Sequence, residues 1–275
     1  MTLLILILVN WVLPRLLNPN NYKAKLAAMV EEKTGRFAKF DGDIALSVFP
    51  GLSLSAKNMT ISNKPGPHQP PFMTVYKMVV ELRLLPLLKD ELAIDAIALD
   101  GLVLNLAKDK QGVNNWDDLF ATDNTVERSR VANAKQDLKW CVGEIAIQNA
   151  RVNWHDQQTG TQFAFKELSF NADKFAFDER SKVRLAMAIS GDFTKLPRFV
   201  TWATAVQIDH KLERILFSES HIEVMASEKP SIQQPLATVM TFPDAEINLA
   251  RQSFQLSGLQ VQNGEIKINA DITGE

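Results

Sequence analysis

The sequence is poor in the residues on which many kinds of functional site depend. Its 275 residues include one cysteine, four histidines and two tyrosines, and its formal net charge is −2. The single cysteine, Cys141, excludes an intramolecular disulfide and a cysteine-based zinc cluster. Acidic and basic residues are interspersed, so the chain lacks the basic stripe that contacts phosphates in nucleic-acid-binding proteins, and we expect no nucleic acid among its partners.

Catalytic motifs are missing as well. The chain has no P-loop, dinucleotide fingerprint or nucleophile elbow. Four histidines lie far apart without HExxH-type spacing: His68, His155, His210 and His221. His155 and Asp156 precede a stretch with the composition of a hairpin turn, so both are predicted to be solvated turn residues. We expect a protein that is not an enzyme and that holds no metal or cofactor.

The sequence does contain a recurring strand pattern, in which apolar residues alternate, shift by one position and then resume. Alternation indicates a strand with one buried face, and the shift indicates a bulge. The shifts fall next to Gly101, Asn149 and Asn263, with a weaker copy around Asn58. The apolar positions are Ile97, Leu99, Leu102, Leu104 and Leu106; Ile145, Ile147, Ala150, Val152 and Trp154; and Leu259, Val261, Gly264, Ile266 and Ile268. The prediction is a mainly β protein with an elongated, curved, bulged antiparallel sheet.

An apolar sheet face must be covered by protein or by other apolar material. One alternative is an ordinary sandwich, in which the face packs on other parts of the chain. The other is an open apolar groove filled by acyl chains, each of whose buried methylenes contributes roughly 0.8 kcal/mol. The candidate groove-lining residues are Leu52, Leu54, Ile97, Leu99, Leu102, Leu104, Ile145, Ile147 and Val152.

An apolar run opens the chain and predicts a membrane anchor over residues 1–17. The run is shorter than the roughly 20 residues that span a bilayer, and it has neither a basic leader nor a small-residue cleavage site. We interpret it as part of a transmembrane helix that begins before Met1; the alternative is a short interfacial anchor. The anchor residues are Leu3, Leu4, Ile5, Leu6, Ile7, Leu8, Val9, Trp11, Val12 and Leu13.

The rest of the chain divides by pattern into two β units. An amphipathic helix carrying Tyr22, Leu26 and Met29 is predicted to end at Gly35, because glycine favours the left-handed conformation that closes helices. The first unit covers residues 18–122, a charged linker covers 123–141, and the second unit covers 142–275. Residues 194–217 mix periods and receive no assignment. The strand pattern continues to Glu275, so we also expect the natural chain to extend further.

Seven short segments between residues 17 and 120 resemble, in order, the start of the AsmA family of bacterial envelope proteins. They are Leu17-Asn18-Pro19-Asn20-Asn21-Tyr22, Glu32-Lys33-Thr34-Gly35-Arg36, Asp41-Gly42-Asp43, Phe49-Pro50-Gly51-Leu52, Leu84-Leu85-Pro86-Leu87-Leu88, the segment from Ile97 to Leu104, and the segment from Gly112 to Leu119. Beyond residue 140 only the pattern is similar. The chain departs from the family in its short anchor and its modest length.

The resemblance implies a single-pass inner-membrane anchor, a body in the periplasm, and a β-groove of the bridge-like lipid-transfer type. It implies phospholipids as ligands and a role in lipid transport and outer-membrane biogenesis. An alternative of another class stays open: a non-enzymatic assembly or scaffold factor that contacts outer-membrane proteins through exposed strand edges.

Overall fold

The computed structural model describes residues 19–48, 51–63, 70–83, 93–120, 141–191, 198–211, 213–226 and 237–274. The predicted anchor and almost all of the predicted linker lie outside these residues. The described helices are the 3₁₀ helix η1 (Pro19–Tyr22), α2 (Lys23–Thr34) and α4 (Asp117–Phe120). None of them has the length and apolar character that crossing a membrane requires.

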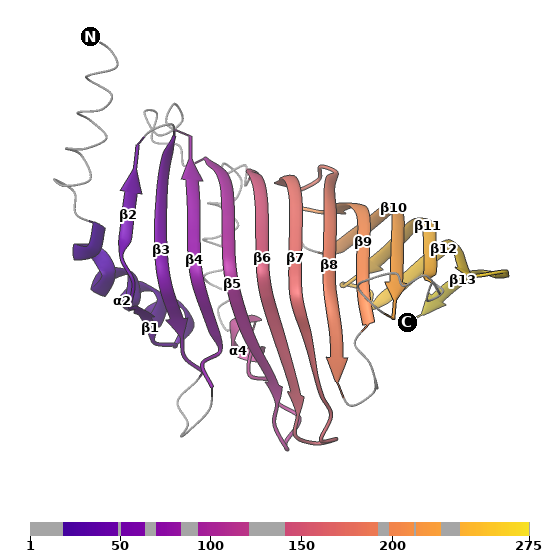
Figure 1. The fold of residues 1–275 in the computed structure, drawn as a ribbon, viewed down its shortest axis with the longest axis horizontal. Helices are drawn as coiled ribbons and strands as arrows, with labels where there is room; N and C mark the ends of the chain where they lie inside the picture. Colours follow the sequence, from indigo (N-terminus) through magenta and orange to yellow (C-terminus); the bar gives the residue numbers. More distant parts are fainter. Residues whose placement is uncertain are drawn as a thin grey trace, which may run out of the picture. The chain divides into compact units, whose positions relative to one another are not determined.

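The described chain is mainly β, as predicted (Figure 1). Its strands are β1 (Ala38–Phe40), β2 (Ile44–Ser47), β3 (Leu52–Ile61), β4 (Met73–Leu82), β5 (Ile94–Lys108), β6 (Cys141–Asp156), β7 (Gln162–Ala176), β8 (Ser181–Gly191), β9 (Arg198–Ile208), β10 (Arg214–Met225), β11 (Thr238–Asn248), β12 (Ser253–Asn263) and β13 (Ile266–Gly274). The hydrogen-bonded order is β1-β3-β4-β5-β6-β7-β8-β9-β10-β11-β12-β13, and β2 also pairs with β3.

Two compact units are distinguished in the chain. The first consists of Met1–Lys139 and Ala150–Gln162, and the second consists of Trp140–Asn149 and Phe163–Glu275. Strand β6 therefore contributes residues to each unit.

Helix α2 confirms the predicted helix and its end. Gly35 adopts φ 66°, and its N–H donates a hydrogen bond to the Glu31 carbonyl at 2.7 Å. This left-handed cap is strained for residues with a Cβ, which explains the glycine. One face of α2 is half-buried: Lys23, Leu26, Ala27, Val30 and Thr34. Tyr22 and Met29, predicted on that face, are instead 53% and 50% exposed.

The predicted shift in β3 and β5 is a kink in phase across three strands. Asn58 and Gly101 have φ values of 49° and 64°. The pairing stays in register around these positions. Met59, Val75 and Leu102 are direct partners on one side of the kink, and Lys57, Lys77 and Asp100 are direct partners on the other side. No extra residue is inserted here in any of the three strands, so the structure has a kink shared by the strands where a bulge was expected. Its effect is to keep the apolar side chains of β3, β4 and β5 on one face.

Substituting Gly101 should therefore be costly. A Cβ at this position would lie 2.8 Å from the Cβ of Tyr76, and the positive φ disfavours any side chain. We expect G101A to lower the free energy of unfolding by about 1–3 kcal/mol in a urea titration. Gly51→Ala is the matched control, since its Cβ would meet nothing within 4 Å. Equal stability of the two variants would contradict the kink as a sterically required feature.

In the second unit the strands β7 to β13 form successive antiparallel hairpins. Three residues with positive φ, Glu167, Glu219 and Gly258, coincide with register shifts between neighbouring strands. Asn149 in β6 also has a positive φ, of 53°, as its place in the pattern predicted. The three register shifts, on β7, β10 and β12, are β-bulges in the usual sense, with an extra residue on one strand.

Two sequence predictions need correction. The third copy of the pattern is not one kinked strand: Leu259 and Val261 lie on β12, whereas Ile266 and Ile268 lie on β13. A tight turn at Gly264 pairs Asn263 with Ile266, so the predicted shift at Asn263 is wrong. Residues 194–217, left unassigned, contain β9 and the start of β10.

Candidate functional site

One candidate site in the first unit is the apolar face of β2 to β5. Directly paired residues in an antiparallel sheet point to the same side, so the register defines rows that cross the strands. Two rows cross four strands: Leu46, Leu54, Val80 and Ile97; and Ile44, Ala56, Met78 and Leu99. Two more cross three strands: Met59, Val75 and Leu102; and Ile61, Met73 and Leu104. All fourteen residues are apolar.

The predicted lining residues on β3 and β5 are thus brought together on one face. Leu52 and Leu54 lie on β3, and Ile97, Leu99, Leu102 and Leu104 lie on β5, all half-buried. Ile145, Ile147 and Val152 are half-buried on β6. Sequence reasoning missed the contribution of β4, although its own shift between Val75 and Met78 repeats the pattern.

The second unit carries an apolar row that crosses seven strands. Its members are Phe170, Leu185, Trp202, Ile222, Met240, Val261 and Ile268. Trp202 stacks on Phe217 with ring centroids 5.3 Å apart. Beside them lies a buried hydroxyl pair, Thr204 and Ser220, whose oxygens are 2.7 Å apart. Thr204 is a polar residue on the apolar face of β9, so it interrupts the alternation of apolar residues by which the strand would have been recognised in the sequence.

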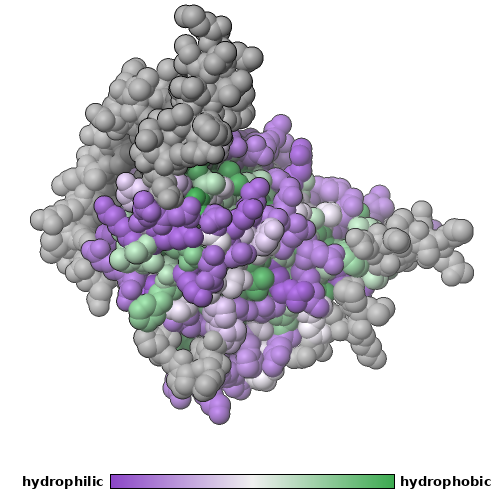
Figure 2. All heavy atoms as spheres, turned by 60° about the vertical axis from the view of Figure 1, so that its left-hand side comes forward, coloured by the Kyte–Doolittle hydropathy of each residue, from purple (hydrophilic) through white to green (hydrophobic). Residues whose placement is uncertain are grey.

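The described chain covers these faces in part: Ile44, Ala56, Met59 and Val75 are buried, and the other members of the rows on β2 to β5 are half-buried. All thirteen strands belong to one sheet, so no second sheet among the described residues packs on the apolar rows. Only twelve apolar side chains of the described residues are buried, and most row members are half-buried. Figure 2 shows a face on which polar and charged side chains predominate, with apolar patches between them. The alternative of a self-packed sandwich does not describe this part of the chain.

A cavity of about 300 Å³ lies beside helix α2. It is lined by Pro19, Tyr22, Lys25, Leu26, Met29, Ile44 and Leu54. Asn20 fixes the helical end of this cavity, because its side chain donates to the Ile44 carbonyl (3.2 Å) and accepts from the Ile44 N–H (3.0 Å). The side-chain amide of Asn20 therefore makes the pair of hydrogen bonds to Ile44 that the backbone of a neighbouring strand would make.

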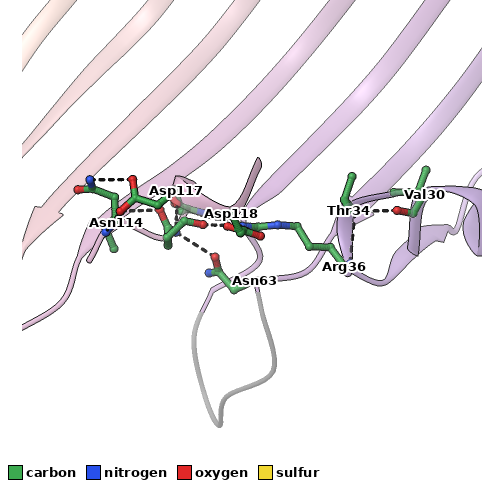
Figure 3. A network of polar contacts seen from close by, with 10 residues as sticks. Val30, Thr34, Arg36, Asn63, Asn114, Asp117 and Asp118 are labelled. Atoms are coloured by element: carbon green, nitrogen blue, oxygen red, sulfur yellow. Dashed lines mark hydrogen bonds and ion pairs between the residues drawn. The ribbon is translucent and has the colours of Figure 1, made fainter. Parts of the chain in front are cut away.

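A buried arginine joins the end of α2 to α4 (Figure 3). Arg36 is 1% exposed; its Nη2 donates to Asp118 Oδ1 at 2.7 Å, and the guanidinium lies 4.3 Å from the Phe72 ring centroid. Within the part of the chain that the structure describes, its Nε and Nη1 have no hydrogen-bond partner. Removing either charge would leave the other buried without compensation.

The neighbouring residues of α4 are also engaged in structural contacts. The Asn115 side chain accepts from Ala107 N–H at 3.0 Å and donates to the Asn105 carbonyl at 2.8 Å, so it continues the ladder of β5. Trp116 packs on Trp154 with centroids 5.3 Å apart. Asn115 and Trp116 therefore fix α4 against the sheet, and the polar groups of the Asn115 side chain are hydrogen-bonded within the chain.

A model of the AsmA family matches residues 1–200. The chain belongs to the AsmA family. It is also similar to Protein AsmA of Escherichia coli (strain K12), with 30% identity over 112 residues, which are 40% of this chain and 18% of that protein. The match thus spans about a fifth of that relative's length. No solved structure matches the chain significantly.

Family membership indicates an envelope-related function, and the structure explains several of the segments that resemble AsmA proteins. Gly35-Arg36 and the segment from Gly112 to Leu119 meet in the contact between Arg36 and Asp118. Asp117 and Asp118 are both engaged in structural contacts. Their roles in this AsmA-family chain are a local cap on Asn114 and an ion pair.

Two carboxylates of the AsmA-family chain should make its stability depend on acid pH. Hydrogen bonds from the Asn114 side chain and backbone hold the pKa of Asp117 below its ordinary value. Burial raises the pKa of Asp156, but hydrogen bonds from Gln158 and Thr159 and the charge of Lys108 outweigh it and lower that pKa. Asp156 is only 9% exposed, so the prediction that it is a solvated turn residue is wrong.

A depressed pKa in the folded state stabilises the protein above the unfolded-state value, and this stabilisation is lost as the pH falls through the folded-state value. We therefore expect the urea concentration at the midpoint of unfolding to decrease as the pH is lowered from 5 to 3. Asp156→Asn should show a smaller decrease, so that the two proteins converge at low pH. An unchanged pH dependence in this variant would show that the Asp156 turn contributes nothing to it.

Proposed function

We propose that this protein shields phospholipid acyl chains on the apolar face of its sheet and thereby supports lipid movement between the inner and outer membranes and outer-membrane biogenesis. We further propose that it is held in the inner membrane by its N-terminal run, with the body in the periplasm. The observation that carries the proposal is the in-phase kink, which keeps one apolar face continuous through β3, β4 and β5. Half-buried side chains on that face retain apolar surface for a ligand.

The first test is direct. The chain is purified from bacterial membranes in mild detergent, and bound lipid is extracted and quantified by mass spectrometry. We expect stoichiometric phospholipid, and refilling after delipidation from phospholipid vesicles. A folded, monodisperse protein that neither carries nor accepts lipid would overturn the proposal.

A scaffold for outer-membrane proteins is the second candidate. It is favoured by the exposed apolar side chains of β13, since Ile266, Ile268 and Ile272 are 66%, 56% and 40% exposed. Exposed apolar side chains of this kind can contact another protein chain. Copurification of a stoichiometric protein partner with a lipid-free sheet would favour this candidate.

A further inference from the structure

The cavity beside α2 lies between the helix and the apolar rows of the sheet. Ile44, only 2% exposed, and Leu54 line it from the sheet, whereas Leu26 and Met29 line it from the helix. Its volume of about 300 Å³ is at the lower end for small-molecule sites. The lining is apolar except for Lys25 and the phenol of Tyr22.

Contacts at each end of the helical segment fix it against the rest of the first unit. At one end the side chain of Asn20 is hydrogen-bonded to the backbone of Ile44. At the other end Arg36 is paired with Asp118. A site that is already formed loses less conformational entropy when its ligand binds, which favours a specific occupant.

The cavity is continuous with the apolar rows of the sheet. Leu54 belongs to the row that reaches Val80 and Ile97, and Ile44 belongs to the row that reaches Met78 and Leu99. With strands about 4.8 Å apart, each row extends roughly 14 Å from β2 to β5. A flexible apolar chain seated in the cavity therefore has a continuous apolar path across the strands.

A charged residue beside the cavity indicates which kind of headgroup the ligand would carry. Lys25 is the one charged lining residue, and it is exposed, so its ammonium can contact an anion while the apolar residues contact a hydrocarbon. We infer that this cavity seats one acyl chain of an anionic phospholipid, with the headgroup phosphate beside Lys25. The inference rests on the proposed function and adds to it a defined site and a headgroup preference.

Binding is tested with the whole chain in mild detergent. It is titrated with vesicles of phosphatidylglycerol or of phosphatidylcholine that carry the same acyl chains, and bound lipids are counted by native mass spectrometry. We expect the wild-type chain to prefer phosphatidylglycerol. Lys25→Glu should weaken phosphatidylglycerol binding about tenfold and remove the preference. Lys33→Glu, the same change at an exposed site on α2 outside the cavity, should leave the preference intact.

A second pair of variants tests the cavity itself. Met29→Trp fills the space from a half-exposed position, so we expect one lipid of either class to be lost. Ala28→Trp, at an exposed neighbouring position on α2, should lose none. The inference is overturned if Lys25→Glu behaves like Lys33→Glu, or if Met29→Trp keeps its full lipid count.

Variants of the sheet separate this inference from the proposed function. If the double variant I97D/L99D loses its lipid but Met29→Trp loses none, the shielding function stands and the cavity site fails. If Met29→Trp loses the bound lipid but I97D/L99D keeps it, the cavity site stands and shielding by the sheet fails.

Discussion

Replacing Ile97 and Leu99 with aspartate should strip the protein of bound phospholipid and leave its sheet folded. Both side chains are half-buried members of apolar rows on β5. Each substitution removes about 1.5–3 kcal/mol of apolar contact and places a carboxylate where an acyl chain would have to desolvate it. Together the two should reduce lipid occupancy at least about a hundredfold. Lipid extraction followed by mass spectrometry measures the loss, and circular dichroism measures the fold.

The opposite face of the same strand provides the control. Ala96 and Ala98 alternate with the substituted residues, and their direct partners are Glu81 and Val79. The variant A96D/A98D adds the same charge at the same level of β5 but faces away from the apolar rows. We expect it to keep its lipid. Equal lipid loss in the two double variants would mean that charge or misfolding, and not the apolar face, governs retention.

Replacing Arg36 with alanine should destabilise the first unit by about 3–5 kcal/mol, because Asp118 would remain largely buried without its counter-charge. The contact with the Phe72 ring would also be lost. Urea unfolding followed by tryptophan fluorescence measures the change, since Trp116 and Trp154 lie in this unit.

Two comparisons make this result interpretable. The exposed pair of Lys39 and Asp41, 74% and 51% exposed, should contribute less than about 1 kcal/mol when Lys39 becomes alanine. Replacing both partners, as in R36M/D118L, should cost less than R36A alone because no unpaired charge is left. A double variant less stable than R36A would contradict the buried-charge explanation.

Local features of the fold were predictable from the sequence because they depend on neighbouring residues. The end of α2 at Gly35 and the kinks at Asn58, Gly101 and Asn149 were placed correctly. The error at Asn263 has a geometric cause. A two-residue turn that pairs Asn263 with Ile266 shifts the apolar alternation by an odd number, as a kink does, so the pattern alone does not distinguish them.

Features that depend on pairing between strands were not predictable. The alternation identified apolar residues on β3 and β5, but their union on one face required the register through β4. The contact between Arg36 and Asp118 joins residues 82 positions apart, and no local signal marks it. The cavity likewise depends on how Asn20 meets Ile44, 24 positions away.

The strand order has a consequence for how the protein folds. From β3 to β13 each strand is hydrogen-bonded to the next strand in the sequence. Pairing of this kind closes short loops, so its entropic cost is small and folding does not wait for distant segments. Each new hairpin can therefore add to the edge of the preceding one as the chain emerges, from the N-terminus onward. Insertion or removal of a whole hairpin would leave the pairing of the others unchanged, which gives evolution a simple means of altering the number of strands.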